Sequence, residues 1–234
     1  YLQGLANPES EFRSKCIKYV SEYTDLSKYN ITYQECRNTI DLIRQSFKWV
    51  HSMKPDFLSI WNMDFDIPKI INTLQAYGVD PASILCDPSI PEAARICKYK
   101  QGQTKKRKAN GQEVSIDVAD QWHTLFLTAS FYVIDAMCTY RLLRLAKPKE
   151  VSYSLDSILE REKVGRKLKF KEADAYKKAR WHTFMQSNYK IEYMVYAMFD
   201  SLSMKLFDDK ILDLSFTLPG YAGITSFNRC NSKP

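Results

Sequence analysis

The chain has 234 residues, of which 45% are hydrophobic and 26% charged, so it is long enough to bury a sizeable core and has the composition of a globular protein. Its six cysteines show no C-x-x-C spacing and form no Cys/His cluster, which argues against a disulfide framework or a zinc site. Their apolar surroundings favour reduced core thiols in a reducing cytoplasm. No apolar run reaches the roughly 18 residues that cross a bilayer, so no membrane partner is expected, and the net charge of +7 favours a polyanionic partner.

The first part of the chain is predicted to be mainly helical. Residues 7–11 open a helical stretch, and residues 29–33 form a short β segment or a turn. Thr32 and Glu35 have the spacing of a capping box, and the apolar residues that follow recur at helical intervals. This helix should end just before Pro55, because proline disfavours helical backbone at the residue that precedes it.

A buried strand and a second helix are predicted after this proline. Residues 57–61 (Phe-Leu-Ser-Ile-Trp) are a mostly apolar run of strand length. Residues 67–74 then open a helix with Pro68 in its first turn, where a missing N–H is tolerated. Asp66 is therefore expected at a strand-to-helix junction, where its side chain can face a cleft. The alternative is that Asp66 serves only as the N-cap of that helix.

Residues 98–112 form a basic segment with six lysine or arginine residues and no acidic residue. Asn110-Gly111 within it is a strong signal for a hairpin turn, so we expect a basic β-ribbon or an insertion loop. Such a segment can follow a phosphate backbone, with Tyr99 available for stacking, and a solvated loop without that role is an equal alternative. The predicted nucleic-acid contacts are Lys105, Lys106, Arg107 and Lys108.

The second half of the chain is predicted to add one strand and further helices. Residues 131–135 (Phe-Tyr-Val-Ile-Asp) form the best second strand, and residues 136–146 should continue as a helix. Asp135, at the end of that strand, is a reserve carboxylate for a metal site, although a helix cap is the more ordinary role. A capped helix starts within residues 152–159, and a strongly basic stretch follows over residues 161–180.

A long helix is predicted over residues 185–206. Four of its side chains should share one face, because their spacing matches successive helical turns. They are Tyr189, Tyr193, Tyr196 and Asp200. Tyr196 can also be read as a half-buried core tyrosine. Strands that alternate with helices along the chain indicate an α/β fold.

Asp66 and Asp200 suggest carboxylates brought from distant parts of the chain onto one metal site. Two-metal phosphodiester hydrolysis needs carboxylates from several elements, and Mg²⁺ prefers a few carboxylates together with water and substrate oxygens. Tyr196, one turn before Asp200, can orient an attacking water. Asn62 can hydrogen-bond to a nucleotide at the strand exit, and Phe65 can pack against it. Each motif alone is a weak signal.

A resemblance to a known family supports the interpretation of these two motifs as parts of one site. The segment 56–68 (Asp-Phe-Leu-Ser-Ile-Trp-Asn-Met-Asp-Phe-Asp-Ile-Pro) closely resembles the second exonuclease motif of family B DNA polymerases. The segment 196–200 (Tyr-Ala-Met-Phe-Asp) matches the Tyr-x-x-x-Asp third motif. The resemblance has a phage-like character and runs from about residue 32 to residue 209. The two motifs occurring together in this order are far more specific than either motif alone. Shorter stretches that resemble the middle of the same domain lie at residues 134–135, 153–159 and 165–168.

This resemblance implies a 3′→5′ proofreading exonuclease with a ribonuclease-H-like, DnaQ-type fold, a mixed sheet flanked by helices, that uses two Mg²⁺ or Mn²⁺ ions. It implies that Asp66 and Asp200 are metal ligands and that Tyr196 positions the water. It also implies that Asn62 and Phe65 contact the 3′-terminal nucleotide. The implied partners are single-stranded DNA at a primer 3′ end and a polymerase core in the same polypeptide or a partner chain, in the host cytoplasm if the source is a virus.

The sequence departs from the family in two ways. The first motif, Asp-x-Glu on an apolar strand, is absent, and two residues separate Asn62 from Phe65 where many members have three. We expect the first motif upstream of Tyr1 in a longer polypeptide. Residues 1–213 are then a partial exonuclease domain that contains the 98–112 insertion, and residues 214–234 form a linker toward a polymerase core. Two alternatives stay open: a non-catalytic single-stranded-DNA-binding or scaffold module of a replication assembly, and a free-standing DnaQ-type nuclease.

Overall fold

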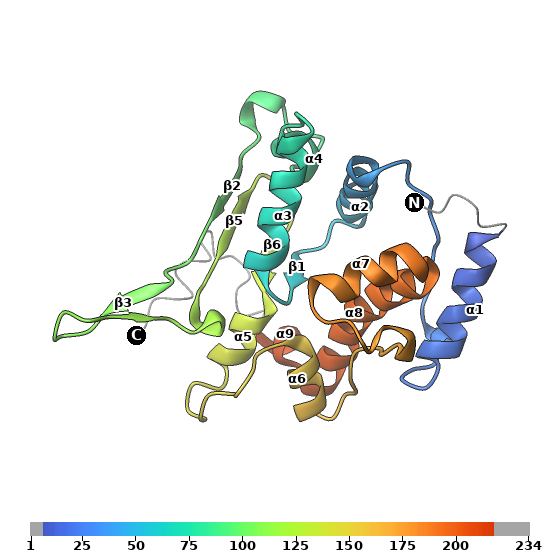
Figure 1. Cartoon of the computed structure of the whole chain (residues 1–234). Helices are drawn as coiled ribbons and strands as arrows, with labels where there is room; N and C mark the ends of the chain where they lie inside the picture. The colour runs from blue at the N-terminus through green and yellow to red at the C-terminus, as the bar shows by residue number, and fades with distance from the viewer. Residues whose placement is uncertain (1–6, 218–234) are drawn as a thin grey trace. The chain divides into compact units, whose positions relative to one another are not determined.

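The computed structural model of the chain describes residues 7–217 and divides into two compact units (Figure 1). Unit 1 combines residues 1–35 with residues 156–211, and unit 2 combines residues 36–155 with the residues from 212 onward. Helices and strands are mixed, which confirms the predicted α/β class. Within the described residues, no helix has both the length and the apolar character that crossing a membrane requires. The predicted linker 214–234 lies almost wholly outside the described residues.

Unit 1 is built from helices around its own hydrophobic core. Helices α1 and α7 both pack on α8. The α1 side of the core comes from Phe12, Cys16 and Val20, which recur every fourth residue and therefore face one way. Asn7 caps α1 by accepting a hydrogen bond from the Ser10 N–H at 3.1 Å. The helices are α1 (Pro8–Val20), α6 (Leu155–Arg161), α7 (Ala179–Asn188) and α8 (Lys190–Ile211), with 3-10 turns η1 (Leu26–Lys28) and η4 (Lys171–Ala173).

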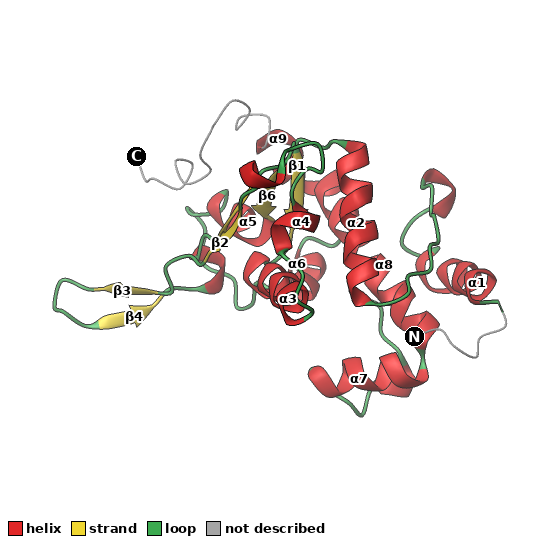
Figure 2. Cartoon of the chain, turned by 90° about the horizontal axis from the view of Figure 1, so that it is seen from above, coloured by secondary structure: helices red, strands yellow, loops and turns green. Residues whose placement is uncertain are grey.

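The single long helix predicted over residues 185–206 is wrong. The chain forms α7 and α8 instead, with a break at Tyr189, whose backbone leaves the helical region at φ −134° and ψ 58°. The N–H of Tyr189 bonds the Met185 carbonyl at 2.8 Å and closes α7, after which α8 starts in a new direction. Figure 2 shows the two helices as separate segments. Of the four residues predicted to share a face, Tyr193, Tyr196 and Asp200 remain on one helix.

Unit 2 contains all the strands of the described residues and a second hydrophobic core. Strands β1 and β6 pair in parallel, β2 and β5 pair antiparallel, and β3 and β4 form a hairpin that extends away from the rest of the unit (Figures 1 and 2). The helices are α2 (Thr39–Met53), α3 (Met63–Ala76), α4 (Pro81–Leu85), α5 (Ala136–Leu142) and α9 (Asp213–Thr217), with η2 (Glu92–Ala94) and η3 (Val118–Asp120). The strands are β1 (Phe57–Ile60), β2 (Cys97–Lys100), β3 (Lys105–Arg107), β4 (Glu113–Ser115), β5 (Thr124–Leu127) and β6 (Tyr132–Asp135).

The two strands predicted beside carboxylate-bearing segments are confirmed, and they are neighbours. The parallel register runs from Phe57 opposite Tyr132 to Ile60 opposite Asp135. Parallel strands end at the same edge of a sheet, so this pairing brings Asp135 beside the segment that follows β1. The helix after β6 is α5, which is shorter than the predicted range 136–146 because it ends at Leu142.

The start predicted for α2 is wrong, and its end is confirmed. Residues 32–36 are irregular, and the helix begins at Thr39 with Asn38 as its N-cap. The Asn38 side chain accepts from the Asp41 N–H at 2.9 Å, while the Asp41 carboxylate accepts from the Arg37 N–H at 3.0 Å. This reciprocal cap satisfies two backbone donors, so the helix starts here and not at the predicted Thr32–Glu35 capping box. The helix ends at Met53, and Lys54 takes a left-handed conformation before Pro55.

Helix α3 begins at Met63, four residues before the predicted start. Its N-cap residue is Asn62, so the alternative reading of Asp66 as the N-cap is wrong. Pro68 consequently lies inside the helix, and Asp66 lies in its first turn. Asp64 and Asp66 do not share a face, since residues two apart in a helix point about 200° apart.

Candidate functional site

Helix α8 brings together two of the predicted site residues, Tyr196 and Asp200, and adds a lysine. Lys167 Nζ lies 2.6 Å from Asp200 Oδ2 and 3.4 Å from the Tyr196 hydroxyl. It also lies 5.5 Å from the centre of the Tyr196 ring. Lys167 comes from a segment without regular secondary structure, in which Leu168 and Phe170 are buried and Lys169 is exposed. The three side chains form one polar cluster in unit 1, which we call the Asp200 cluster.

Burial sets the protonation of the Asp200 cluster. Burial raises the pKa of the Tyr196 hydroxyl, and the neighbouring Asp200 charge raises it further, so Tyr196 is a neutral donor at neutral pH. Burial raises the pKa of Asp200 as well, and the Lys167 ammonium opposes this shift. For Lys167, burial alone lowers the pKa, but the hydrogen bond and charge of Asp200 outweigh it and the net pKa is raised. Lys167 therefore keeps its proton, and the pair is an ion pair.

One oxygen of Asp200 is placed to accept a cation. Asp200 Oδ1 is buried and has no hydrogen-bond partner within the described part of the chain, whereas Oδ2 is engaged by Lys167. A buried carboxylate oxygen without a donor is costly unless a ligand satisfies it. Asp200 therefore fits the role of one metal ligand. Over residues 7–217, however, no three His, Cys, Asp or Glu side chains gather in a way that could hold a metal ion.

An aromatic wall adjoins the Asp200 cluster within unit 1. The ring centres of Trp181 and Tyr196 lie 4.9 Å apart, and those of Tyr193 and Tyr196 lie 6.1 Å apart in a stacked arrangement. His182 Nδ1 and the Tyr193 hydroxyl are 3.2 Å apart, which fixes the orientation of both rings. His182 thus packs at the edge of the site. The wall supplies flat, partly exposed surfaces beside a carboxylate.

The other predicted site residues lie in unit 2 at the first turn of α3. Phe65 is 58% exposed, so much of its ring lies at the surface, and Lys69 Nζ covers one face of the ring at 3.1 Å from its centre. Asp66 is partly exposed in the same turn, and Asn62 precedes it. Asn62 makes no capping hydrogen bond with its side chain. One helical turn therefore carries Asn62, Phe65 and Asp66.

Asp135 fixes the start of α3. Its carboxylate is 1% exposed and accepts hydrogen bonds from the Met63 N–H at 2.8 Å and the Cys138 N–H at 3.0 Å. It thereby caps α5, as predicted, and satisfies a free donor of α3. Burial raises the pKa of Asp135 to about 6, although these two N–H bonds act in the opposite direction. Asp135 is a structural carboxylate, which leaves its predicted reserve role as a metal ligand without support.

A hydrogen-bonded chain beside α3 was not predicted. The Tyr99 hydroxyl lies 2.5 Å from Asp64 Oδ1 and 2.9 Å from His123 Nδ1, and its ring stacks on the His123 imidazole. Burial, followed by the Asp64 hydrogen bond, raises the pKa of Tyr99, and burial lowers the pKa of His123. Tyr99 is therefore engaged inside unit 2, and the prediction that it is available for stacking on a base is wrong. No local sequence signal links these three positions.

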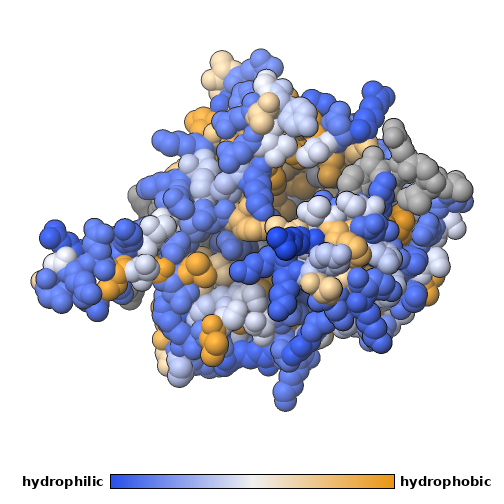
Figure 3. Space-filling view, viewed as in Figure 1, coloured by the Kyte–Doolittle hydropathy of each residue, from blue (hydrophilic) through white to orange (hydrophobic). Residues whose placement is uncertain are grey.

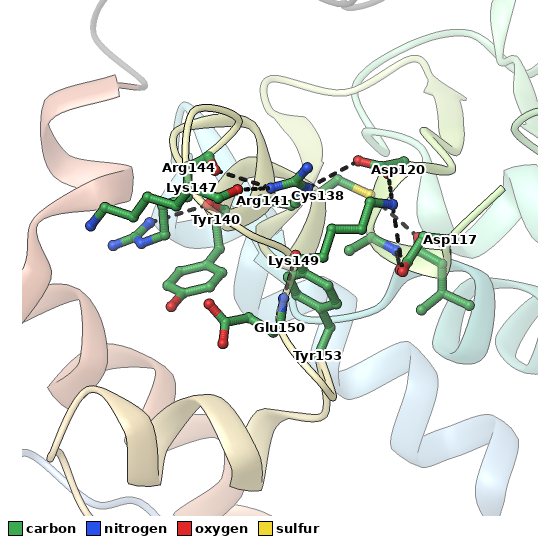
Figure 4. A network of polar contacts seen from close by, with 12 residues as sticks. Asp117, Asp120, Cys138, Tyr140, Arg141, Arg144, Lys147, Lys149, Glu150 and Tyr153 are labelled. Carbon is green, nitrogen blue, oxygen red and sulfur yellow. Dashed lines mark hydrogen bonds and ion pairs between the residues drawn. The ribbon is translucent and has the colours of Figure 1, made fainter.

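A cavity of about 490 Å³ opens beside Asn62 in unit 2. Its floor includes Trp61, whose indole N–H donates to the Tyr153 carbonyl at 3.0 Å. One wall belongs to the polar network in Figure 4, in which Lys149 pairs with Asp120 and lies 3.6 Å from Asp117. Arg141 Nε lies 3.4 Å from the other oxygen of Asp120. This network holds the loops around the cavity in place, so Asn62 faces a preformed space.

The predicted hairpin turn at Asn110-Gly111 is confirmed, whereas residues 98–100 of the predicted basic segment lie in β2 and pair with β5. The Gly111 N–H bonds the Lys108 carbonyl at 2.9 Å, and Gly111 has the positive φ of 85° that the turn requires. The basic side chains on this hairpin are exposed, and the space-filling view shows a mainly hydrophilic projection (Figure 3). Lys105 is offset by Glu113 at 3.6 Å. The four predicted nucleic-acid contacts are Lys105, Lys106, Arg107 and Lys108.

The structure thus gathers the predicted residues into two groups. Tyr196 and Asp200 lie together in unit 1, and Asn62, Phe65 and Asp66 lie together in unit 2. A metal site made from Asp66 and Asp200 needs a residue from each unit, so it stays a prediction. The added member, Lys167, was not predicted as a site residue, although it lies within residues 165–168, one of the shorter stretches of the family resemblance.

Comparison with known proteins assigns no family. No model of a known protein family matches this chain, and no curated protein matches its sequence.

Proposed function

We propose that the chain is the 3′→5′ exonuclease domain of a family B DNA polymerase, with a DnaQ-type fold. The observation that carries the proposal is the Asp200 cluster, in which a tyrosine and a carboxylate of the Tyr-x-x-x-Asp motif meet beside a buried, unsatisfied carboxylate oxygen. The motif order in the sequence and the parallel strand that leads into Asn62–Asp66 support it further.

Each residue has a role that follows from its chemistry. Asp200 would hold one metal ion, and the motif resemblance makes Asp66 the other carboxylate ligand; a bound metal would supply an activated water and stabilise charge on the phosphate. Tyr196, a neutral hydroxyl, orients the water or the scissile phosphate by donating a hydrogen bond. Lys167 neutralises Asp200 when no metal is present and offers a cation to the phosphate.

The remaining residues act on the substrate. Asn62 hydrogen-bonds the 3′-terminal nucleotide, and the exposed ring of Phe65 packs against it. The hairpin with Lys105, Lys106, Arg107 and Lys108 follows the phosphate backbone of single-stranded DNA or of the primer end. The polymerase core is a partner in the same polypeptide or in a second chain.

A second candidate is a non-catalytic module that binds single-stranded DNA in a replication assembly. One observation favours it: Lys167 Nζ lies 2.6 Å from Asp200 Oδ2 and neutralises this carboxylate without a metal ion. An ammonium in this place makes a stable ion pair that needs no metal.

The test compares Asp200→Asn with Asp209→Asn in the longest form of the protein that contains this sequence. Asp209 lies on the same helix as a surface partner of Lys205, so its change removes the same charge away from the cluster. Release of nucleotides from 5′-labelled single-stranded DNA is measured in Mg²⁺ and in Mn²⁺. Asp200→Asn should slow release by about 10²-fold or more, as for other lost groups that stabilise transition-state charge, and Asp209→Asn should not. Equal rates in the two variants would refute a catalytic role for Asp200, and DNA binding without release in the wild type would favour the non-catalytic module.

A further inference from the structure

A small cavity in unit 1 combines positive charge with aromatic surface. It measures about 270 Å³ and lies against the Asp200 cluster, with which it shares two residues. Its chemically distinctive lining residues are Lys167, Lys169, Lys178, Trp181, His182 and Tyr196. One carboxylate, Asp174, also lines it, so cationic side chains outnumber anionic ones in its wall.

Two of the three lysines are available for an anion. Lys167 is engaged by Asp200, whereas Lys169 and Lys178 are exposed and form no ion pair within residues 7–217. Lys169 lines the cavity together with its neighbours Leu168 and Phe170, whose side chains are buried. Helix α7 starts directly after Lys178 with no acidic residue in its first turn, which adds to the positive field. The wall of the cavity therefore carries a net positive charge, which favours an anionic group.

The aromatic side of the cavity offers a flat surface for a base. Trp181 is partly exposed and is braced by Tyr196 at 4.9 Å and by the edge of His182 at 5.0 Å between ring centres. Bracing on two sides keeps the indole from rotating away, so the exposed part of its surface is available for stacking. Aromatic rings beside basic side chains are the usual means of holding single-stranded nucleic acid, because every base has a π-face and every nucleotide a phosphate.

We propose that this cavity binds one nucleotide unit of a single-stranded nucleic acid, with its phosphate between Lys169 and Lys178 and its base against Trp181. A duplex does not fit this description, because its bases are stacked inside the helix. The inference rests on the proposed function, since Lys167 and Tyr196 belong to both sites. It adds a subsite that none of the sequence motifs contains.

The experiment measures binding of fluorescein-labelled (dT)₈ to the full chain by fluorescence anisotropy in EDTA, without metal. The variants are Lys178→Gln and Trp181→Leu, and the control is Lys177→Gln, which removes an adjacent charge that does not line the cavity. Lys178→Gln and Trp181→Leu should each weaken binding by about 5-fold or more, while Lys177→Gln stays within about 2-fold of the wild type. Lys178→Gln should also reduce the slope of log affinity against log salt by about 0.7, the value for one phosphate contact on a single strand.

Two further variants separate lost contacts from lost folding. Trp181→Phe keeps a ring in the wall and Lys178→Arg keeps the charge, so both should retain most of the affinity. Equal losses in Lys178→Gln and Lys177→Gln, or unchanged binding in Trp181→Leu, would overturn the inference, as would equal competition by a DNA duplex. If (dT)₈ binds in the expected pattern but no metal-dependent release occurs, the proposed exonuclease fails and the subsite stands. If nucleotides are released but the variants bind alike, the subsite fails and the exonuclease stands.

Discussion

Asp135→Asn should change how the stability of unit 2 depends on pH. The Asp135 carboxyl is 1% exposed, and burial raises its pKa to about 6. An unfolded aspartate ionises near pH 3.9, so between pH 4 and pH 6 the unfolded chain releases a proton that the folded chain keeps. The wild type therefore loses stability as the pH rises through this window. Asparagine does not titrate, and the variant lacks this loss.

The size of the effect follows from the two pKa values. A difference of about 2 pH units at 1.36 kcal/mol for each gives about 3 kcal/mol in total, of which about 2 kcal/mol falls between pH 4.5 and pH 7.5. The free energy of unfolding of the wild type minus that of Asp135→Asn should therefore fall by about 2 kcal/mol between pH 4.5 and pH 7.5. A constant offset of about 1–3 kcal/mol accompanies it, because the Asn amide replaces one of the two oxygens that accept from Met63 and Cys138.

The assay is urea unfolding at both pH values, followed by tryptophan fluorescence, which includes the buried Trp61 of unit 2. Asp87→Asn is the control. The exposed Asp87 carboxylate accepts hydrogen bonds from Ser89, which lower its pKa, so its stabilising effect is lost as the pH falls. Because Asp87 ionises below pH 4.5 in both the folded and the unfolded chain, its wild-type minus variant difference should stay nearly constant between pH 4.5 and pH 7.5. A difference for Asp135→Asn that stays the same at pH 4.5 and pH 7.5 would refute the reasoning.

Two backbone substitutions should change stability in opposite directions, measured as shifts in the urea midpoint. Gly102→Ala should destabilise the chain by about 1–3 kcal/mol, because the added alanine Cβ would lie 2.3 Å from the Trp122 carbonyl oxygen. An unchanged urea midpoint would contradict this close approach. Lys54→Gly should stabilise it by up to about 1 kcal/mol, because Lys54 ends α2 in a left-handed conformation at φ 46° that glycine adopts without strain; destabilisation would contradict it.

The parts of the fold that the sequence predicted depend on neighbouring residues. The strands at 57–60 and 132–135 are short apolar runs, and the hairpin turn is a dipeptide signal, so each is set within a few residues. The end of α2 was predicted for the same reason, since Pro55 acts on the residue before it.

The parts that the sequence did not predict depend on distant partners. The start of α3 is fixed by the Asp135 carboxylate, which lies 72 positions away, and no pattern around Met63 contains that information. Lys167 meets Asp200 across 33 positions, and Tyr99 meets Asp64 across 35. The Tyr196–Asp200 pair could be predicted from the sequence because the two residues lie one turn apart on a single helix.

The hairpin has a practical consequence for anyone who wishes to alter this protein. Its turn at residues 108–112 is exposed and is held by its own ladder and by hydrogen bonds within the turn. Extending such a turn from about 5 to about 20 residues costs only about 1 kcal/mol of loop-closure entropy, since each doubling costs about 0.6 kcal/mol. The tip can therefore receive an affinity tag or a fluorescent label without disturbing either hydrophobic core. A label placed there reports directly on whatever the basic hairpin touches.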